Sequence, residues 1–301
     1  MKQQLKLLGT LLAAVLLGAC GLLTENAVAP TTTAVQETTQ APRVEVKADG
    51  TFTEKEYTFV SNGKKIYARA YIPDVQGQVP LVVYSHGLGA SVDHDEEVQK
   101  TLAKSGVAVF SFEFAGGSSS TSPKSEGATT EMSVLTEVQN LRDALQFATS
   151  LPFVKADRIY LMGSSQGGFV SSLMAQEVAN LAGVFLLYPA FSLPDDIRSS
   201  FPKLDEAPET FNLLGTKISK KYLADVYPID AYEGLGKISA PVHIYHGADD
   251  FIVPVTVSKK AVKSLKDARL TALDETGHSL TSEQQTQIGL EIADEIFNGM
   301  K

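Results

Sequence analysis

The chain has 301 residues, of which 44% are hydrophobic and 20% are charged, and its formal net charge is −9. This is the composition of a folded globular protein and lies far from that of disordered chains. An acidic chain is a poor candidate for nucleic-acid binding, which needs basic groups to neutralise phosphates. The only cysteine is Cys20, which excludes a disulfide framework and a cysteine-based zinc site.

The first twenty residues are typical of a secretory signal peptide. Lys2 and Lys6 precede an apolar stretch over residues 7–19 that is short for a transmembrane helix. Residues 17–20 read LGAC, which resembles the lipobox of bacterial lipoproteins. The resemblance implies acylation of Cys20, so that the protein would be anchored to a membrane of the bacterial cell envelope with its domain outside the cytoplasm. An ordinary signal peptide with a chance cysteine is the alternative.

The segment that follows is rich in Thr, Ala and Gln and shows no helical or strand period. Such a composition predicts a flexible tether between a lipid anchor and a folded domain. We therefore expect a signal peptide over residues 1–19, the lipidated Cys20 with its tether over residues 20–50, and one domain over residues 51–301.

The domain opens with a pattern typical of a β-hairpin. Strand-forming residues at 57–60 and 66–72 flank Asn62 and Gly63, which readily take the positive φ angles of a tight turn. Apolar strand-like runs follow at residues 81–84, 107–112, 158–162, 184–188, 242–245 and 270–273. Amphipathic stretches of helical length lie near residues 93–104, 130–150, 166–179, 256–266 and 281–298. This alternation predicts an α/β domain whose mostly parallel central sheet is covered by helices on both faces.

One interval, residues 191–238, breaks the alternation. It has no buried-strand run, and an insertion of this length predicts a small functional cap. A surface excursion whose aromatic residues only pack on the sheet is the alternative. Its aromatic residues are Phe191, Phe201, Phe211, Tyr222, Tyr227 and Tyr232.

A candidate nucleophile follows the predicted strand 158–162. Residues 163–168 read GSSQGG, a Gly-x-Ser-x-Gly sequence between a strand and a helix, which is the context that this motif requires. The glycines permit a turn too tight for side chains, and it projects Ser165 above the carboxyl edge of the sheet. Free N–H groups at the start of the next helix favour an oxyanion, so Ser165 is the predicted nucleophile and Gln166 a predicted backbone donor. The glycine spacing centres on Ser165 and excludes Ser164.

Three more stretches follow predicted strands: residues 85–89 (SHGLG), 246–254 (HGADDFIVP) and 276–279 (TGHS). Together with the GSSQGG segment, they make the chain resemble the α/β-hydrolase superfamily over about residues 55–298.

Within this superfamily the chain is most similar to bacterial esterases that include cinnamoyl (feruloyl) esterases. Residues 109–116 (VFSFEFAG) and 186–190 (LLYPA) carry the finer likeness. Two positions depart from it: Glu113 stands where these enzymes usually have Asp, and Ser164 stands where His usually precedes the nucleophile.

The resemblance implies a catalytic triad in the chain order Ser, acid, His. His278 is the only histidine far enough beyond Ser165 to leave a strand and an acid between them, so it is the predicted base. The family pattern His-Gly-x-x-Asp-x-x-Val-Pro selects Asp250 as the acid, with Asp249 as the alternative.

The family's His-Gly-x-Gly form assigns the second oxyanion N–H to Leu88 and leaves His86 a structural role in holding that loop. The implied function is a serine carboxylic-ester hydrolase that forms an acyl-enzyme with small to medium acyl or aryl esters. This chemistry calls for no metal and no organic cofactor. Its expected partners are a small-molecule ester and, through the lipid on Cys20, a membrane.

Three other functions fit the same sequence. The first is a serine peptidase of the prolyl-oligopeptidase or a related aminopeptidase branch, and the second is a lipase or thioesterase. The third is a surface-binding lipoprotein on an inactive hydrolase scaffold, although that reading predicts a damaged triad and every member is present here.

Overall fold

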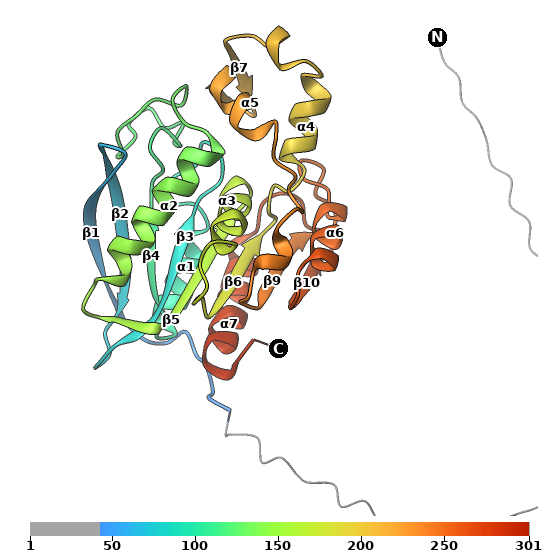
Figure 1. The fold of residues 1–301 in the computed structure, drawn as a ribbon. Coiled ribbons are helices and arrows are strands. Elements are labelled where there is room, and N and C mark those ends of the chain that lie inside the picture. Colours follow the sequence, from blue (N-terminus) through green and yellow to red (C-terminus); the bar gives the residue numbers. More distant parts are fainter. Residues whose placement is uncertain (1–42, 301) are drawn as a thin grey trace, which may run out of the picture. The chain divides into compact units, whose positions relative to one another are not determined.

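The computed structural model describes residues 43–300 (Figure 1). The predicted signal peptide over residues 1–19, the predicted lipidation site Cys20 and the tether before Arg43 lie outside the described residues.

An eight-stranded sheet forms the centre of the domain. Its strands are β1 (Phe52–Ser61), β2 (Lys64–Pro73), β3 (Val79–Ser85), β4 (Ala108–Phe112), β5 (Val154–Ser164), β6 (Gly183–Leu187), β9 (Val242–Gly247) and β10 (Ala268–Leu273). The spatial order is β1-β2-β4-β3-β5-β6-β9-β10. β2 runs antiparallel to both of its neighbours, and all other neighbouring strands are parallel. The mostly parallel sheet predicted from the sequence is therefore confirmed.

Helices cover both faces of this sheet (Figure 1). They are α1 (Glu96–Lys104), α2 (Val134–Thr149), α3 (Gln166–Ala175), α6 (Thr256–Ser264) and α7 (Ser282–Asn298). Successive side chains of a strand point to opposite faces, so the side chains of β3 pack in two hydrophobic cores, one on each face of the sheet. Leu81 and Val83 pack in the core beneath α2 and α3, whereas Val82 and Tyr84 pack in the core beneath α1 and α7. This explains why the central strands read as continuous apolar runs.

The N-terminal hairpin forms as predicted. Ser61 pairs with Lys64, and Asn62 and Gly63 form the turn with φ angles of 47° and 74°. These positive angles match the right-handed twist of the two strands.

The insertion over residues 191–238 contains α4 (Leu193–Ser200), the 3₁₀ turns η1 (Leu204–Glu206) and η2 (Leu235–Lys237), β7 (Thr210–Leu213), β8 (Thr216–Ser219) and α5 (Lys220–Val226). Its two strands pair only with each other, through a turn at Leu214 and Gly215 with φ angles of 48° and 90°. The sequence showed no strand run here because these strands are short and partly exposed. In Figure 1, α4, β7 and α5 stand together above one end of the sheet.

The described part of the predicted tether contacts the domain. The backbone of Val44 both donates to and accepts from the side chain of Asn298 in α7, and the N–H of Gly50 donates to the carbonyl of Lys104. The folded part of the chain therefore begins before residue 50.

Among residues 43–300, no helix combines the length and the apolar character needed to cross a membrane.

Candidate active site

Ser165 occupies a strained turn between β5 and α3. Its φ and ψ angles are 51° and −119°, a conformation that residues other than glycine seldom adopt. The flanking glycines are required, because a Cβ at Gly163 would lie 2.4 Å from the carbonyl oxygen of Gly167. A Cβ at Gly167 would lie 2.2 Å from the carbonyl oxygen of Ser85. The close approach of these backbones holds the hydroxyl of Ser165 at the carboxyl edge of the sheet.

The structure brings Ser165, His278 and Asp250 together. His278 Nε2 lies 3.0 Å from Ser165 Oγ, and His278 Nδ1 lies 2.7 Å from Asp250 Oδ2. The three residues come from loops after β5, β10 and β9, whose carboxyl ends meet at one edge of the parallel sheet. This geometry can pass a proton from the hydroxyl to the imidazole while the carboxylate stabilises the resulting cation.

Asp250 is oriented by its own loop. Its Oδ1 accepts hydrogen bonds of 2.9 Å from the backbone N–H groups of Ile252 and Val253. Burial raises the pKa of Asp250, but hydrogen bonds from His246, His278 and Val253 outweigh it and hold the pKa well below its usual range. Asp249, the alternative acid in the sequence, is exposed.

Two other histidines serve the loops rather than the reaction. The buried His86 donates from Nδ1 to the carbonyl of Gly87 at 2.7 Å, and its Nε2 accepts from the N–H of Phe114 at 3.1 Å. Burial lowers the pKa of His86 to about 4, so the ring is neutral and ties two loops together. His246 is also buried, and its Nε2 lies 2.8 Å from the carbonyl oxygen of Val253 and 3.2 Å from Asp250 Oδ2, so it holds the loop that carries Asp250.

The two predicted oxyanion donors lie beside the nucleophile. Gln166 is the first residue of α3, so its backbone N–H has no partner within the helix. Leu88 lies in the loop after β3, where Gly87 approaches so closely that a Cβ there would lie 3.2 Å from Ser165 Cβ. Ser165, Gln166 and Leu88 line the same cavity. Their positions allow two backbone amides to face an oxygen bound near Ser165.

Sequence reasoning missed two residues that hold the side chain of Gln166. Its Nε2 donates to Glu137 Oε2 at 2.7 Å, and its Oε1 accepts from the hydroxyl of Tyr222 at 2.5 Å. Glu137 and Tyr222 are both buried, and they come from α2 and from α5 of the insertion. No local pattern marks Glu137, because it lies within an otherwise ordinary amphipathic helix.

A cavity of about 490 Å³ opens over Ser165. Its walls combine α4 and β7 of the insertion with the loop after β9, and most of the lining side chains are apolar. At its rim, Leu214 and Phe251 are 71% and 86% exposed. The apolar lining includes Leu193, Ile197, Phe201, Phe211, Leu213, Leu214, Phe251, Ile252 and Val253. Such a cavity suits an apolar group of a small molecule, held with its reactive carbon at the serine.

No cluster of His, Cys, Asp or Glu side chains with the arrangement of a metal site occurs in the described part of the chain.

Comparison with known proteins gives the same fold. Residues 80–213 match the model of a family described as alpha/beta hydrolase fold. A search of curated protein sequences finds no match.

Several solved structures superpose on most of the chain. Est1E from Butyrivibrio proteoclasticus, solved with bound ferulic acid, is 25% identical, has a TM-score of 0.71, and the match covers 78% of this chain and 97% of that one. The alpha/beta hydrolase GrgF from Penicillium sp. sh18 is 15% identical with a TM-score of 0.68, over 82% of this chain and 100% of that one. The esterase domain of a Rhodothermus marinus protein is 20% identical with a TM-score of 0.62, over 80% and 96%. The chain therefore has the α/β-hydrolase fold, and esterases are among its structural neighbours.

Proposed function

We propose that this protein is a serine carboxylesterase that hydrolyses esters of small to medium acyl or aryl acids through an acyl-enzyme. The observation that carries the proposal is the hydrogen-bonded series Asp250–His278–Ser165 at the base of a largely apolar cavity. The α/β-hydrolase fold and the ferulic acid bound to Est1E support an ester, including an aryl ester, as the substrate class.

In the proposed first step, Ser165 Oγ attacks the ester carbonyl while His278 Nε2 takes the hydroxyl proton. The backbone N–H groups of Gln166 and Leu88 stabilise the oxyanion, and Asp250 stabilises the imidazolium. Collapse of the tetrahedral intermediate breaks the bond to the alcohol, which leaves with the proton from His278.

In the second step, His278 takes a proton from water, and the hydroxide adds to the acyl carbon of the Ser165 ester. Collapse of this intermediate releases the carboxylic acid and returns the proton to Ser165. The whole cycle uses only groups of this chain and water.

The first experiment measures hydrolysis by the full-length protein in detergent and by its Ser165→Ala variant. The substrates are p-nitrophenyl acetate, butyrate and decanoate, methyl ferulate and an aminoacyl anilide. We expect turnover of the short esters or the ferulate, and a loss of about 10³-fold or more in kcat for Ser165→Ala. Ser199→Ala, which changes an exposed serine, should match the wild type.

Each other function gives a different result in this assay. Preference for the anilide would indicate a peptidase, and preference for the decanoate would indicate a lipase or thioesterase. Equal activity of Ser165→Ala and wild type, or no turnover at all, would contradict the proposal and favour a binding lipoprotein.

We also propose that the protein is tethered to the bacterial cell envelope by lipid on Cys20. The support is the LGAC sequence at residues 17–20 after a short apolar stretch. Labelled palmitate supplied to the producing cells should label the wild type and leave Cys20→Ala unlabelled. Equal labelling of both, or of neither, would contradict the tether.

A further inference from the structure

A buried hydrogen-bond cluster lies behind the candidate triad and takes no part in the steps above. We define it as Tyr84, Asp95, Ser164 and Tyr188. The hydroxyl groups of Tyr84 and Tyr188 both donate to the carboxyl group of Asp95 at 3.0 Å. The hydroxyl of Tyr84 also lies 2.8 Å from Ser164 Oγ. All four side chains are buried, and burial raises the pKa of both tyrosines, so they stay protonated donors.

Tyr188 connects this cluster to the base. Its ring lies edge-on to the imidazole of His278, with centroids 4.9 Å apart and an interplanar angle of 63°. The backbone of Tyr188 has a φ of 38°, which is strained for a bulky residue. Strain of this kind persists only where surrounding contacts hold it, and it gathers at functional sites.

The same segment also holds the nucleophile. The N–H of Ser165 donates to the carbonyl of Leu187, and the N–H of Ala190 donates to the carbonyl of Ser165, both at 2.9 Å. Tyr188 lies between these two bonds. Its side chain therefore contacts the base, while its chain neighbours fix the backbone of the nucleophile.

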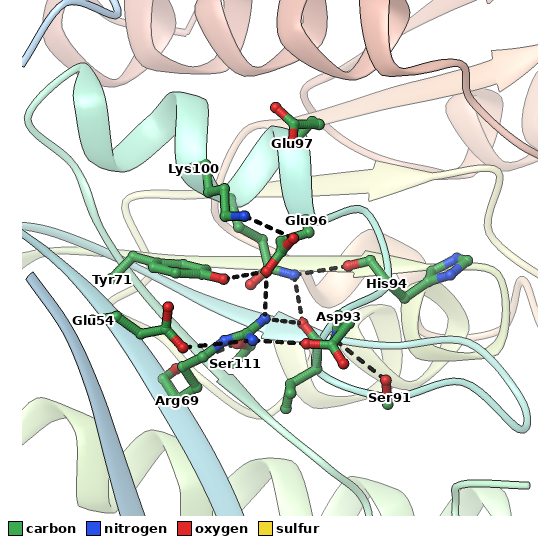
Figure 2. Close-up of polar contacts among 12 residues, drawn as sticks. Glu54, Arg69, Tyr71, Ser91, Asp93, His94, Glu96, Glu97, Lys100 and Ser111 are labelled. Carbon is green, nitrogen blue, oxygen red and sulfur yellow. Dashed lines mark hydrogen bonds and ion pairs between the residues drawn. The ribbon is translucent and has the colours of Figure 1, made fainter. Parts of the chain in front are cut away.

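Asp95 is itself held by the loop before α1, and Figure 2 shows the contacts of the loop residues Asp93 and His94. The guanidinium of the buried Arg69 donates to Asp93 at 2.7 Å and to the carbonyl of Val92 at 3.0 Å. The side chain of Gln99 donates to the carbonyls of Val92 and His94. These bonds hold the loop so that Asp95 takes a left-handed conformation, with a φ of 51° and its side chain directed inward.

A second hollow of about 330 Å³ lies beside the cluster. Tyr188 lines it together with Asp95, His94 and Ser279, the residue after the candidate base. The side chain of Tyr188 therefore contacts both this hollow and the imidazole of His278. A smaller side chain at position 188 would leave open space beside the imidazole, which Asp250 holds from Nδ1 alone.

We propose that Tyr188 and Asp95 are positioning residues: the Asp95 carboxyl group fixes the Tyr188 ring, and the ring keeps His278 directed at Ser165. The inference rests on the proposed esterase function. Tyr84 links Ser164, the residue before the nucleophile, to the same carboxyl group. This gives Ser164 a role in the same cluster.

The test uses the full-length protein and the variants Tyr188→Leu, Tyr188→Phe and Asp95→Asn. Two experiments are made: steady-state hydrolysis gives kcat and KM for p-nitrophenyl butyrate, and proton NMR records the downfield resonance of the His278 Nδ1–H. We expect kcat to fall on the order of 100-fold for Tyr188→Leu and on the order of 10-fold for the other two, with KM unchanged. The resonance should broaden in Tyr188→Leu and remain in Tyr188→Phe.

Tyr245→Phe is the matched control. It also removes the hydroxyl of a fully buried tyrosine that donates to a carboxyl group, here Glu295 at 3.3 Å, and it should keep the wild-type kcat. Folded Tyr188→Phe and Asp95→Asn variants with wild-type kcat would overturn the inference, and both remain informative if Tyr188→Leu does not fold. The resonance is recorded without substrate, so it tests the positioning role even if no ester is hydrolysed.

Discussion

The side-chain amide of Gln166 donates to the carboxyl group of Glu137 across 2.7 Å, and this bond joins the residue after the nucleophile to the buried face of helix α2. Glu137 is buried, and burial raises its pKa to about 8 against the opposing effect of that hydrogen bond. At neutral pH the group is therefore mostly protonated. Gln166, the proposed oxyanion donor, is thus bonded through its side chain to a carboxyl group whose pKa lies above 7.

Glu137→Gln is expected to change how stability depends on pH. The pKa of Glu137 is raised from 4.5 in the unfolded chain, so its contribution to stability is fully present below about pH 4.5. That contribution is lost as the pH rises to about 8, because the unfolded chain releases its proton more readily than the folded protein. The variant does not titrate, so its free energy of unfolding relative to wild type should rise between about pH 5 and pH 8.

Urea unfolding at several pH values measures this difference. A difference between wild type and Glu137→Gln that stays constant over the range would show that Glu137 is ionised in the folded protein.

Tyr222→Phe should destabilise the protein and disturb the insertion. The change leaves Gln166 Oε1 buried without the hydroxyl that donates to it, which costs about 1–3 kcal/mol of unfolding free energy. Tyr227→Phe is the control, because the Tyr227 hydroxyl donates to the carbonyl of Pro202 at an exposed position, and its effect should stay within about 0.5 kcal/mol. Equal effects in thermal unfolding would contradict the assigned role of Tyr222.

Asp250→Asn should lower kcat by about 10³- to 10⁴-fold, because an amide cannot stabilise the imidazolium of His278 in the tautomer that activates Ser165. Asp249→Asn, which changes the exposed neighbour, should stay within about twofold of wild type. Steady-state hydrolysis of the best substrate decides between them. A large loss in Asp249→Asn with little loss in Asp250→Asn would exchange the two assignments.

Phe251→Ser should raise KM for long acyl esters and leave KM for the acetate ester unchanged. Phe251 lies at the rim of the cavity and is 86% exposed, so it can be covered by an acyl chain that extends outward. Loss of one such contact is expected to raise KM for p-nitrophenyl decanoate on the order of 10-fold. Val60→Ser, on the distant strand β1, is the control and should leave KM unchanged for both esters. An equal change in KM for esters of every chain length would show that the acyl chain does not contact Phe251.

Much of the fold could be predicted because its determinants are local. Asn62 and Gly63 specify their turn without help from distant residues, and buried parallel strands show themselves as apolar runs. The candidate triad could be named because its three residues stand in motifs that resemble those of α/β-hydrolases. The parallel sheet then brings the residues that follow its strands to one edge.

The contacts around the site could not be predicted, because they join residues that no period relates. Glu137 and Tyr222 both bond to the side chain of Gln166, and Asp95 reaches Tyr188 after β6 because α1 packs on the sheet. The strand β5 also begins earlier than the sequence indicated, at Val154, because its first residues are partly exposed and lack an apolar run.

The hydrogen bonds between Val44 and Asn298 fix the first described residues against the C-terminal end of α7. α7 starts shortly after His278, at the end of the strands that holds the candidate site. Its last turn lies near the other end, where the carbonyl of Ile296 accepts a hydrogen bond from Arg158 in the first half of β5. Val44 and Ser165 thus lie toward opposite ends of the parallel strands. The mouth of the cavity beside Phe251 and the segment that begins at Arg43 therefore occupy separate surfaces of this domain.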